Sequence, residues 1–165
     1  MTEQSRIMSL VEDLARELLD RQWRCVTAES CTGGGIARAL TELAGSSDWF
    51  ERGFVTYSNE AKQDMLGVRD ETLARHGAVS EETAREMAEG ALARSRGQAA
   101  IAVTGIAGPS GSSPTKPVGT VVFAWALEGG ATATRVRHFE GDRQAVREAS
   151  VEQGIEGLLI RLRQA

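Results

Sequence analysis

Residues 24–40, RCVTAESCTGGGIARAL, contain the pattern on which the predicted fold depends. The first part, RCVTAES, is typical of a short buried strand, and it ends just before the glycine run at 33–35. Apolar residues at helical spacing follow the glycines, so the run predicts a tight passage from a strand into a helix. A strand that feeds directly into a helix is the first unit of an α/β fold.

The rest of the chain continues this alternation. Apolar spacing and end signals predict helices over 3–21, 34–44 with a stop at Gly45, 59–67, from an N-cap at Ser80 to Gly97, and from about Asp142 onward. Short apolar or alternating runs predict strands over 51–58, 99–103, 120–127 and 132–139, the last two joined as an antiparallel hairpin. We therefore expect a three-layer α/β/α sandwich with a mixed, largely parallel sheet, formed by a single domain over residues 1–165.

Composition and charge exclude several classes of protein. The chain is 41% hydrophobic and 25% charged, which is ordinary for a soluble globular protein. Its formal net charge of -4 argues against nucleic-acid binding, for which a basic face is expected. No apolar run approaches the ~20 residues of a membrane span, and the start carries no signal pattern. We expect a cytoplasmic protein whose Cys25 and Cys31 are reduced.

Lysine and tyrosine are scarce in this chain. Of the 19 basic residues only Lys62 and Lys116 are lysines, and Tyr57 is the single tyrosine. Both types of side chain can lose a proton, which arginine in practice cannot. Tyr57 lies at a predicted strand end and Lys62 in the next helix. Either they act together in proton transfer, with the pKa of the lysine lowered by burial, or Lys62 is a solvated residue and Tyr57 a core aromatic.

The glycine run at 33–35 also has two interpretations. A helix that opens at the end of a strand brings backbone N–H groups and a positive dipole end to one point, which suits an anion or a developing oxyanion. The run matches neither GxxxxGK[ST] nor GxGxxG, so a triphosphate or dinucleotide site is poorly supported. The alternative is a purely structural turn. Glu29, just before it, either orients a basic group or is a polar residue at the edge of the turn.

Two neighbouring residues of this turn are candidate nucleophiles. Ser30 needs a base, but His76 and His138 lie outside any motif and the chain has no GxSxG, so a Ser-His-Asp triad is not supported. Lysine is the other possible base. Cys31 would gain thiolate character at a helix N-terminus, or it is simply a small buried residue.

A second glycine-rich segment, TGIAGPSGSSPTKPVG at 104–119, follows the central apolar strand. In an open sheet with parallel strands it falls at the carboxyl edge near the first glycine run, where ligands bind. Thr104 is then placed to hydrogen-bond a substrate, and the backbone of Gly105 and Gly108 to line it. Lys116 faces either a phosphate or solvent.

The last predicted helix begins with two arginines one turn apart, Arg143 and Arg147. Together they have the chemistry to clamp a phosphate. Separately they form a solvated face, and this is the interpretation that we favour for Arg147.

Taken together, these segments resemble the CinA C-terminal domain family. The segments that carry the resemblance occur in the family's order: TAESCTGGGIARALTELAGSS (27–47), GFVTYSNEAKQDMLGV (53–68), GAVSEETA (77–84), AVTGIAGPSG (102–111), KPVGTV (116–121) and FEGDRQAVR (139–147). The resemblance extends from about residue 7 to residue 160. That family includes the bacterial nicotinamide-nucleotide amidohydrolases.

The resemblance implies an activity and a set of site residues. The activity is hydrolysis of the carboxamide of nicotinamide mononucleotide to nicotinate mononucleotide and ammonia, in pyridine nucleotide recycling, by a homodimer without a metal or other cofactor. The implied nucleophile is Ser30, supported by Lys62 and Tyr57. The residues implied on the substrate side are Thr32, Gly33, Gly34, Thr104, Gly105, Gly108 and Arg143.

Two alternatives stay open. The chain is a non-catalytic module that binds a pyridine nucleotide or a protein partner, or it is a cysteine hydrolase that uses Cys31 on another amide.

Overall fold

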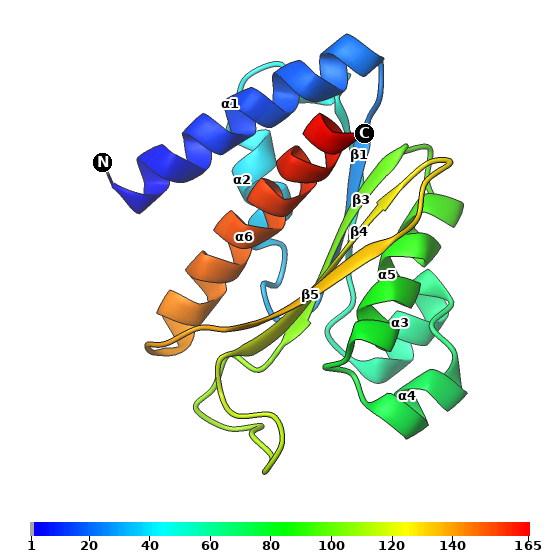
Figure 1. Cartoon of the computed structure of the whole chain (residues 1–165), viewed down its shortest axis with the longest axis vertical. Helices are drawn as coiled ribbons and strands as arrows, with labels where there is room; N and C mark the ends of the chain where they lie inside the picture. The colour runs from blue at the N-terminus through cyan, green and yellow to red at the C-terminus, as the bar shows by residue number, and fades with distance from the viewer. Residues whose placement is uncertain (1) are drawn as a thin grey trace.

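A five-stranded sheet in the order β2-β1-β3-β4-β5 forms the centre of the computed structural model, which describes residues 2–165 (Figure 1). The strands are β1 (Cys25–Glu29), β2 (Phe50–Val55), β3 (Ala99–Gly105), β4 (Thr120–Leu127) and β5 (Ala133–His138). β1 pairs in parallel with both β2 and β3, whereas β3-β4 and β4-β5 are antiparallel. The predicted mixed sheet and its terminal hairpin are therefore confirmed.

Helices cover both faces of this sheet. They are α1 (Glu3–Arg21), α2 (Gly35–Thr41), α3 (Asn59–Leu66), α4 (Asp70–His76), α5 (Glu81–Ala93) and α6 (Arg143–Gln164), with a short 3-10 helix at Ser46–Asp48. Figure 1 shows α1, α2 and α6 on one face and α3, α4 and α5 on the other. This is the expected α/β/α sandwich. None of the helices within residues 2–165 is long and apolar enough to cross a membrane.

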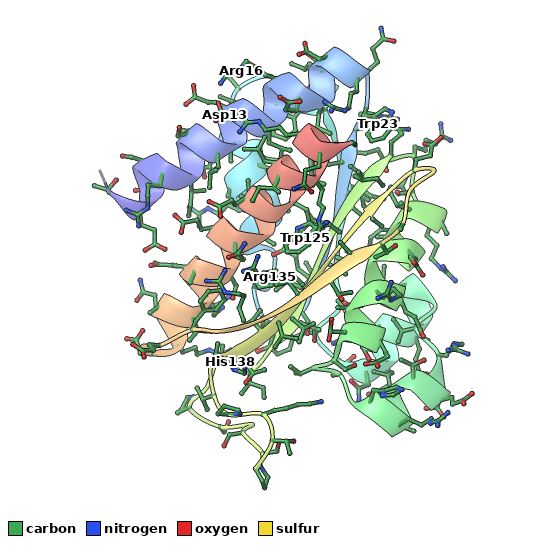
Figure 2. All side chains as sticks on the ribbon, in the orientation of Figure 1. Asp13, Arg16, Trp23, Trp125, Arg135 and His138 are labelled. Atoms are coloured by element: carbon green, nitrogen blue, oxygen red, sulfur yellow. The ribbon has the colours of Figure 1, made fainter. Side chains whose placement is uncertain are left out.

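The two faces have different cores. The face under α6 is filled by large side chains, among them Trp125, which lies between β4 and α6 (Figure 2). Its indole Nε1 donates a hydrogen bond to the carbonyl of Gly154 at 2.9 Å, and its ring stacks on Phe123. The face under α5 is built largely from buried alanines of both helix and sheet, which include Ala84, Ala88, Ala91, Ala100, Ala102 and Ala124. Small residues on both surfaces let α5 lie close to the sheet.

Most helix ends follow the predicted signals. The side chain of Ser80 caps α5 as expected. The helix α6 starts where predicted, and the side chain of Asp142 caps it. Several boundaries differ from the prediction, three of them at the ends of α2, α5 and β2. α2 ends at Thr41 and α5 at Ala93, each a few residues early, and β2 ends at Val55 because the following segment turns away to start α3. The short helix α4 was not predicted as a separate element.

Gly90 sets the distance between α5 and α3. A Cβ at this position would lie 1.9 Å from the carbonyl oxygen of Leu66, the last residue of α3. We expect Gly90→Ala to lower the free energy of unfolding by roughly 1–3 kcal/mol, because the helices must move apart to admit the methyl group. Urea denaturation measures the change. Gly130→Ala is the matched control, since its nearest atom would be at 3.6 Å, and a Gly90→Ala variant as stable as that control would contradict this packing.

Candidate active site

Three segments converge at the carboxyl ends of the parallel strands. The N–H of Ser30, the first residue after β1, donates to the carbonyl of Val103 in β3 at 3.0 Å. On the other side, the N–H of Thr56, the first residue after β2, donates to the carbonyl of Glu29 at 2.8 Å. The parallel register therefore holds Ser30 at the sheet edge, between the segments that follow β2 and β3.

Lys62 reaches Ser30 from α3. Its Nζ lies 3.0 Å from Ser30 Oγ and donates a second hydrogen bond to the carbonyl of Thr56 at 2.9 Å. Only 1% of Lys62 and 8% of Ser30 is exposed. α3 begins where Ser58 Oγ accepts a hydrogen bond from the Ala61 N–H, and this cap sets the start of the helix that carries the lysine.

Burial lowers the pKa of Lys62 from its ordinary value. Both hydrogen-bond partners of its amine are neutral groups, so the charged form gains little in return for its lost hydration. A neutral amine has a lone pair that can accept the hydroxyl proton of a neighbouring serine. Of the two interpretations, the solvated lysine is wrong, and Ser30 and Lys62 form a hydroxyl–amine pair.

Glu29 holds the turn that follows it. Its buried carboxylate accepts hydrogen bonds from Thr32 Oγ1 at 2.5 Å, from the Ile36 N–H at 2.9 Å and from the Ala37 N–H at 3.0 Å. The last two N–H groups belong to the first turn of α2 and have no partner within the helix. The acid therefore caps α2, so of the two roles considered for it, that of a polar residue of the turn describes it better than that of a partner to a basic group.

The glycine run has a conformational role. Gly33 and Gly34 have φ of 58° and 102°, in the left-handed region that favours glycine. Above the turn, Arg147 of α6 donates from Nε to the carbonyl of Cys31 at 3.1 Å and from Nη2 to the carbonyl of Thr32 at 3.4 Å. The solvated position that we favoured for Arg147 is therefore wrong.

Cys31 is an unsuitable nucleophile in this setting. It is 5% exposed, and burial raises the pKa of its thiol to about 12. The thiol is then protonated at neutral pH, because desolvation by burial outweighs the backbone hydrogen bond and the positive charge of Arg147 that favour the thiolate. The second interpretation, a small buried residue, describes it better.

Tyr57 and Arg143 form a separate group at the edge of the site. Tyr57 is 61% exposed, so it is not a core aromatic, and its hydroxyl accepts a hydrogen bond from Arg143 Nη2 at 2.9 Å. Nη1 of the same guanidinium donates to the carbonyl of Gly108 at 2.8 Å. Arg143 thus ties the start of α6 to the second glycine-rich segment and to the segment after β2.

Other predicted residues have structural partners. Thr104 Oγ1 donates to the carbonyl of Ala78 at 2.9 Å, which fastens the end of β3 to the segment before α5. Gly105 ends β3, where a Cβ would lie 2.9 Å from the Thr120 carbonyl. Lys116 Nζ donates to the carbonyl of His76 at 3.0 Å.

The two histidines have their own partners. His76 Nδ1 lies 3.8 Å from a carboxylate oxygen of Glu82. His138, the last residue of β5 (Figure 2), has its Nδ1 3.3 Å from Thr120 Oγ1 at the start of β4. Lysine therefore stays the base nearest to Ser30. Within residues 2–165, no group of three or more His, Cys, Asp or Glu side chains is placed to hold a metal ion.

The sequence model of the CinA C-terminal domain family matches residues 7–162 of this chain. The chain belongs to the CinA C-terminal domain family. The resemblance drawn from the sequence motifs is thereby confirmed. The chain is 54% identical over 154 residues to nicotinamide-nucleotide amidohydrolase PncC of Escherichia coli K12, an alignment that covers 93% of each protein. It is 48% identical to the protein of the same name from Pseudomonas putida, covering 93% of this chain and 95% of that one.

Solved structures and longer relatives agree with this assignment. The crystal structure of competence/damage inducible protein CihA from Agrobacterium tumefaciens superposes with a TM-score of 0.92 at 49% identity, covering 96% of both chains. A CinA-like protein of Akkermansia muciniphila is 48% identical to 92% of this chain, but the match covers only 36% of that protein. The same fold therefore also occurs as part of longer chains.

The sequence patterns did not predict the contributions of two residues to the site. Thr56 acts through its backbone carbonyl, which no side-chain pattern reveals. Arg147 contacts a carbonyl 116 residues away, and its spacing in the helix is equally typical of a solvated face. Its place one turn after Arg143 was the available signal.

The buried amine makes stability depend on pH. The pKa of Lys62 is lower in the folded state than the ordinary 10.5, so between these two values the unfolded chain binds more protons. Stability from this group therefore rises with pH in that interval and is lost as pH falls. We expect the free energy of unfolding of Lys62→Met, minus that of the unmodified protein, to decrease as pH rises toward 10.5.

Denaturant titrations across this pH range check the expectation. Lys116→Met, which changes the other lysine, is the matched control because Lys116 is less buried. A difference for Lys62→Met that does not change with pH would contradict the buried, neutral amine.

Proposed function

We propose that this protein is an amidohydrolase that converts nicotinamide mononucleotide to nicotinate mononucleotide and ammonia, with Ser30 as nucleophile and Lys62 as base. The observation that carries the proposal is the 3.0 Å contact between Lys62 Nζ and Ser30 Oγ at a buried strand end. The names of the relatives from Escherichia coli and Pseudomonas putida support the substrate class.

The first half of the reaction forms an ester. Ser30 Oγ attacks the carboxamide carbon while its proton moves to Lys62 Nζ. The carbonyl oxygen becomes an oxyanion, which backbone N–H groups of the glycine-rich turns stabilise. The C–N bond then breaks as Lys62 returns the proton to the leaving nitrogen, and ammonia departs. The electron-poor pyridinium ring favours attack at the carbonyl.

The second half releases the acid. Water attacks the ester carbon and gives a proton to Lys62, and the bond to Ser30 Oγ breaks as the proton passes to the serine. The carboxylic acid leaves as nicotinate mononucleotide. The geometry supports direct transfer between Ser30 and Lys62, because the hydroxyl of Tyr57 is hydrogen-bonded to Arg143. In this proposal Tyr57 holds Arg143 and borders the ring site.

The substrate side would be formed by the two glycine-rich segments. Arg143 is exposed and held by two hydrogen bonds at the edge of the site, so its guanidinium is available to the phosphate. Thr104, Gly105 and Gly108 would border the ribose and ring from the segment after β3. From the turn after β1, Thr32, Gly33 and Gly34 would do the same.

Two further expectations stay predictions, the homodimer implied by the resemblance and the cytoplasmic location drawn from the sequence composition. Multi-angle light scattering of the purified chain tests the homodimer, and cell fractionation tests the cytoplasmic location. A non-catalytic binding module remains the alternative function. It would show a thermal shift with nicotinamide mononucleotide but no release of ammonia.

Removing the nucleophile tests the chemistry. We expect Ser30→Ala to lower kcat for ammonia release from nicotinamide mononucleotide by more than about 1,000-fold, because no other hydroxyl or thiolate is paired with the base. Cys31→Ala is the matched neighbour, and we expect it to stay within about fivefold of the unmodified protein. The reverse pattern would instead support a cysteine hydrolase.

The pH dependence of the rate tests the base. Lys62 must be neutral to accept a proton, so kcat/KM should rise with pH and level off above the lowered pKa of Lys62, below the ordinary 10.5. Steady-state rates across the pH range measure this. Activity that falls as pH rises from 6 to 9 would rule out a neutral amine as the base.

A further inference from the structure

Two backbone donors beside the nucleophile are unused. Within residues 2–165, no carbonyl and no side chain of another residue accepts a hydrogen bond from the N–H groups of Cys31 and Thr32, whereas Ser30, Gly33 and Gly35 all donate to carbonyls. Cys31 and Thr32 are only 5% and 2% exposed. Buried backbone N–H groups are nearly always paired, so two unpaired ones in succession call for a ligand that carries an acceptor.

The direction of one of these donors is set by Arg147. In a trans peptide the carbonyl and the following N–H point in opposite directions. The Cys31 carbonyl accepts a hydrogen bond from Arg147 Nε, so it points toward α6. The Thr32 N–H must then point away from α6. The helix α3, which carries Lys62, lies on the opposite face of the sheet from α6 (Figure 1).

The contact between Arg147 and the turn is closely fitted. Nη2 of the same guanidinium also reaches the Thr32 carbonyl at 3.4 Å. A Cβ at Gly33 would lie 3.2 Å from this nitrogen. Because glycine has no Cβ, the guanidinium can lie against the turn at this position. The Cys31 N–H is oriented by a different contact. The Gly33 N–H donates to the Ser30 carbonyl at 3.0 Å, and the Cys31 N–H of the same peptide therefore points the opposite way from that carbonyl.

We propose that Arg147 is a positioning residue for the oxyanion site: it holds the peptide between Cys31 and Thr32 so that the Thr32 N–H, with that of Cys31, faces the oxygen of the carbonyl that Ser30 attacks. The inference rests on the proposed function, because it requires Ser30 to attack a carbonyl. The guanidinium acts through the backbone and does not touch the substrate. It is needed most when negative charge develops on that oxygen, so its loss lowers kcat rather than raising KM.

The test compares three variants on nicotinamide mononucleotide. Arg147→Met keeps the aliphatic stem and removes both hydrogen bonds, and we expect kcat to fall roughly 100-fold with KM within about twofold. Arg147→Lys can still reach one carbonyl, so we expect its kcat to be about tenfold higher than that of Arg147→Met. Arg163→Met on the same helix is the matched control, because Arg163 pairs with Asp13 and Glu17, away from the turn.

A second readout does not depend on the substrate. A fluorophosphonate reacts with an activated serine and places a phosphonyl oxygen where the oxyanion would form. We expect Arg147→Met to slow labelling of Ser30 by about the same factor as kcat, while thermal unfolding shows that the variant is folded. If Arg147→Met does not fold, Arg147→Lys takes its place in both assays.

The outcomes separate the two proposals. If the unmodified protein releases no ammonia but is labelled at Ser30, the proposed substrate is wrong and the labelling rates decide the role of Arg147. If it is neither active nor labelled, both proposals are wrong. A folded Arg147→Met with unchanged kcat and unchanged labelling, or with only KM raised, overturns the positioning role.

Discussion

A lysine amine held out of water beside a serine hydroxyl is the constraint on which the rest of the structure depends. Lys62 has two neutral hydrogen-bond partners, and burial lowers its pKa. Desolvating an amine is unfavourable, so the surrounding structure must hold it there. The cap at Ser58 starts α3 at the right residue, and Gly90 lets α5 press against the end of the same helix. Chemistry and packing are joined in these few contacts.

The parallel half of the sheet supplies the frame for that contact. The strands β2, β1 and β3 end at the same edge of the sheet, with Glu29 opposite Val55 and Val103. A segment of the site follows each of these strand ends. The antiparallel half has another role, since β4 and β5 return the chain to α6. That helix then delivers two arginines to the same edge, one at the Gly108 carbonyl and one at the Cys31 carbonyl.

Local signals made much of the fold predictable from the sequence. The order of elements and the caps at Ser80 and Asp142 depend on neighbouring residues, which periodicity and cap chemistry describe well. Lys62 was singled out because lysine is rare in the chain. Its burial could not be derived, since a solvated helix residue has the same spacing. The role of Arg147 was out of reach for a similar reason, because its partners are backbone carbonyls at the other end of the chain.

The bridge from Arg147 to Cys31 also has a consequence for biosynthesis. The turn that holds the serine is made early, but the arginine that orients its peptides belongs to the final helix. During translation the strands β1, β2 and β3 can all leave the ribosome before that helix is complete. A nascent chain therefore contains Ser30 and Lys62 long before Arg147 can bond the Cys31 carbonyl, and on the proposed role of Arg147 it would become active only after its C-terminal helix has docked.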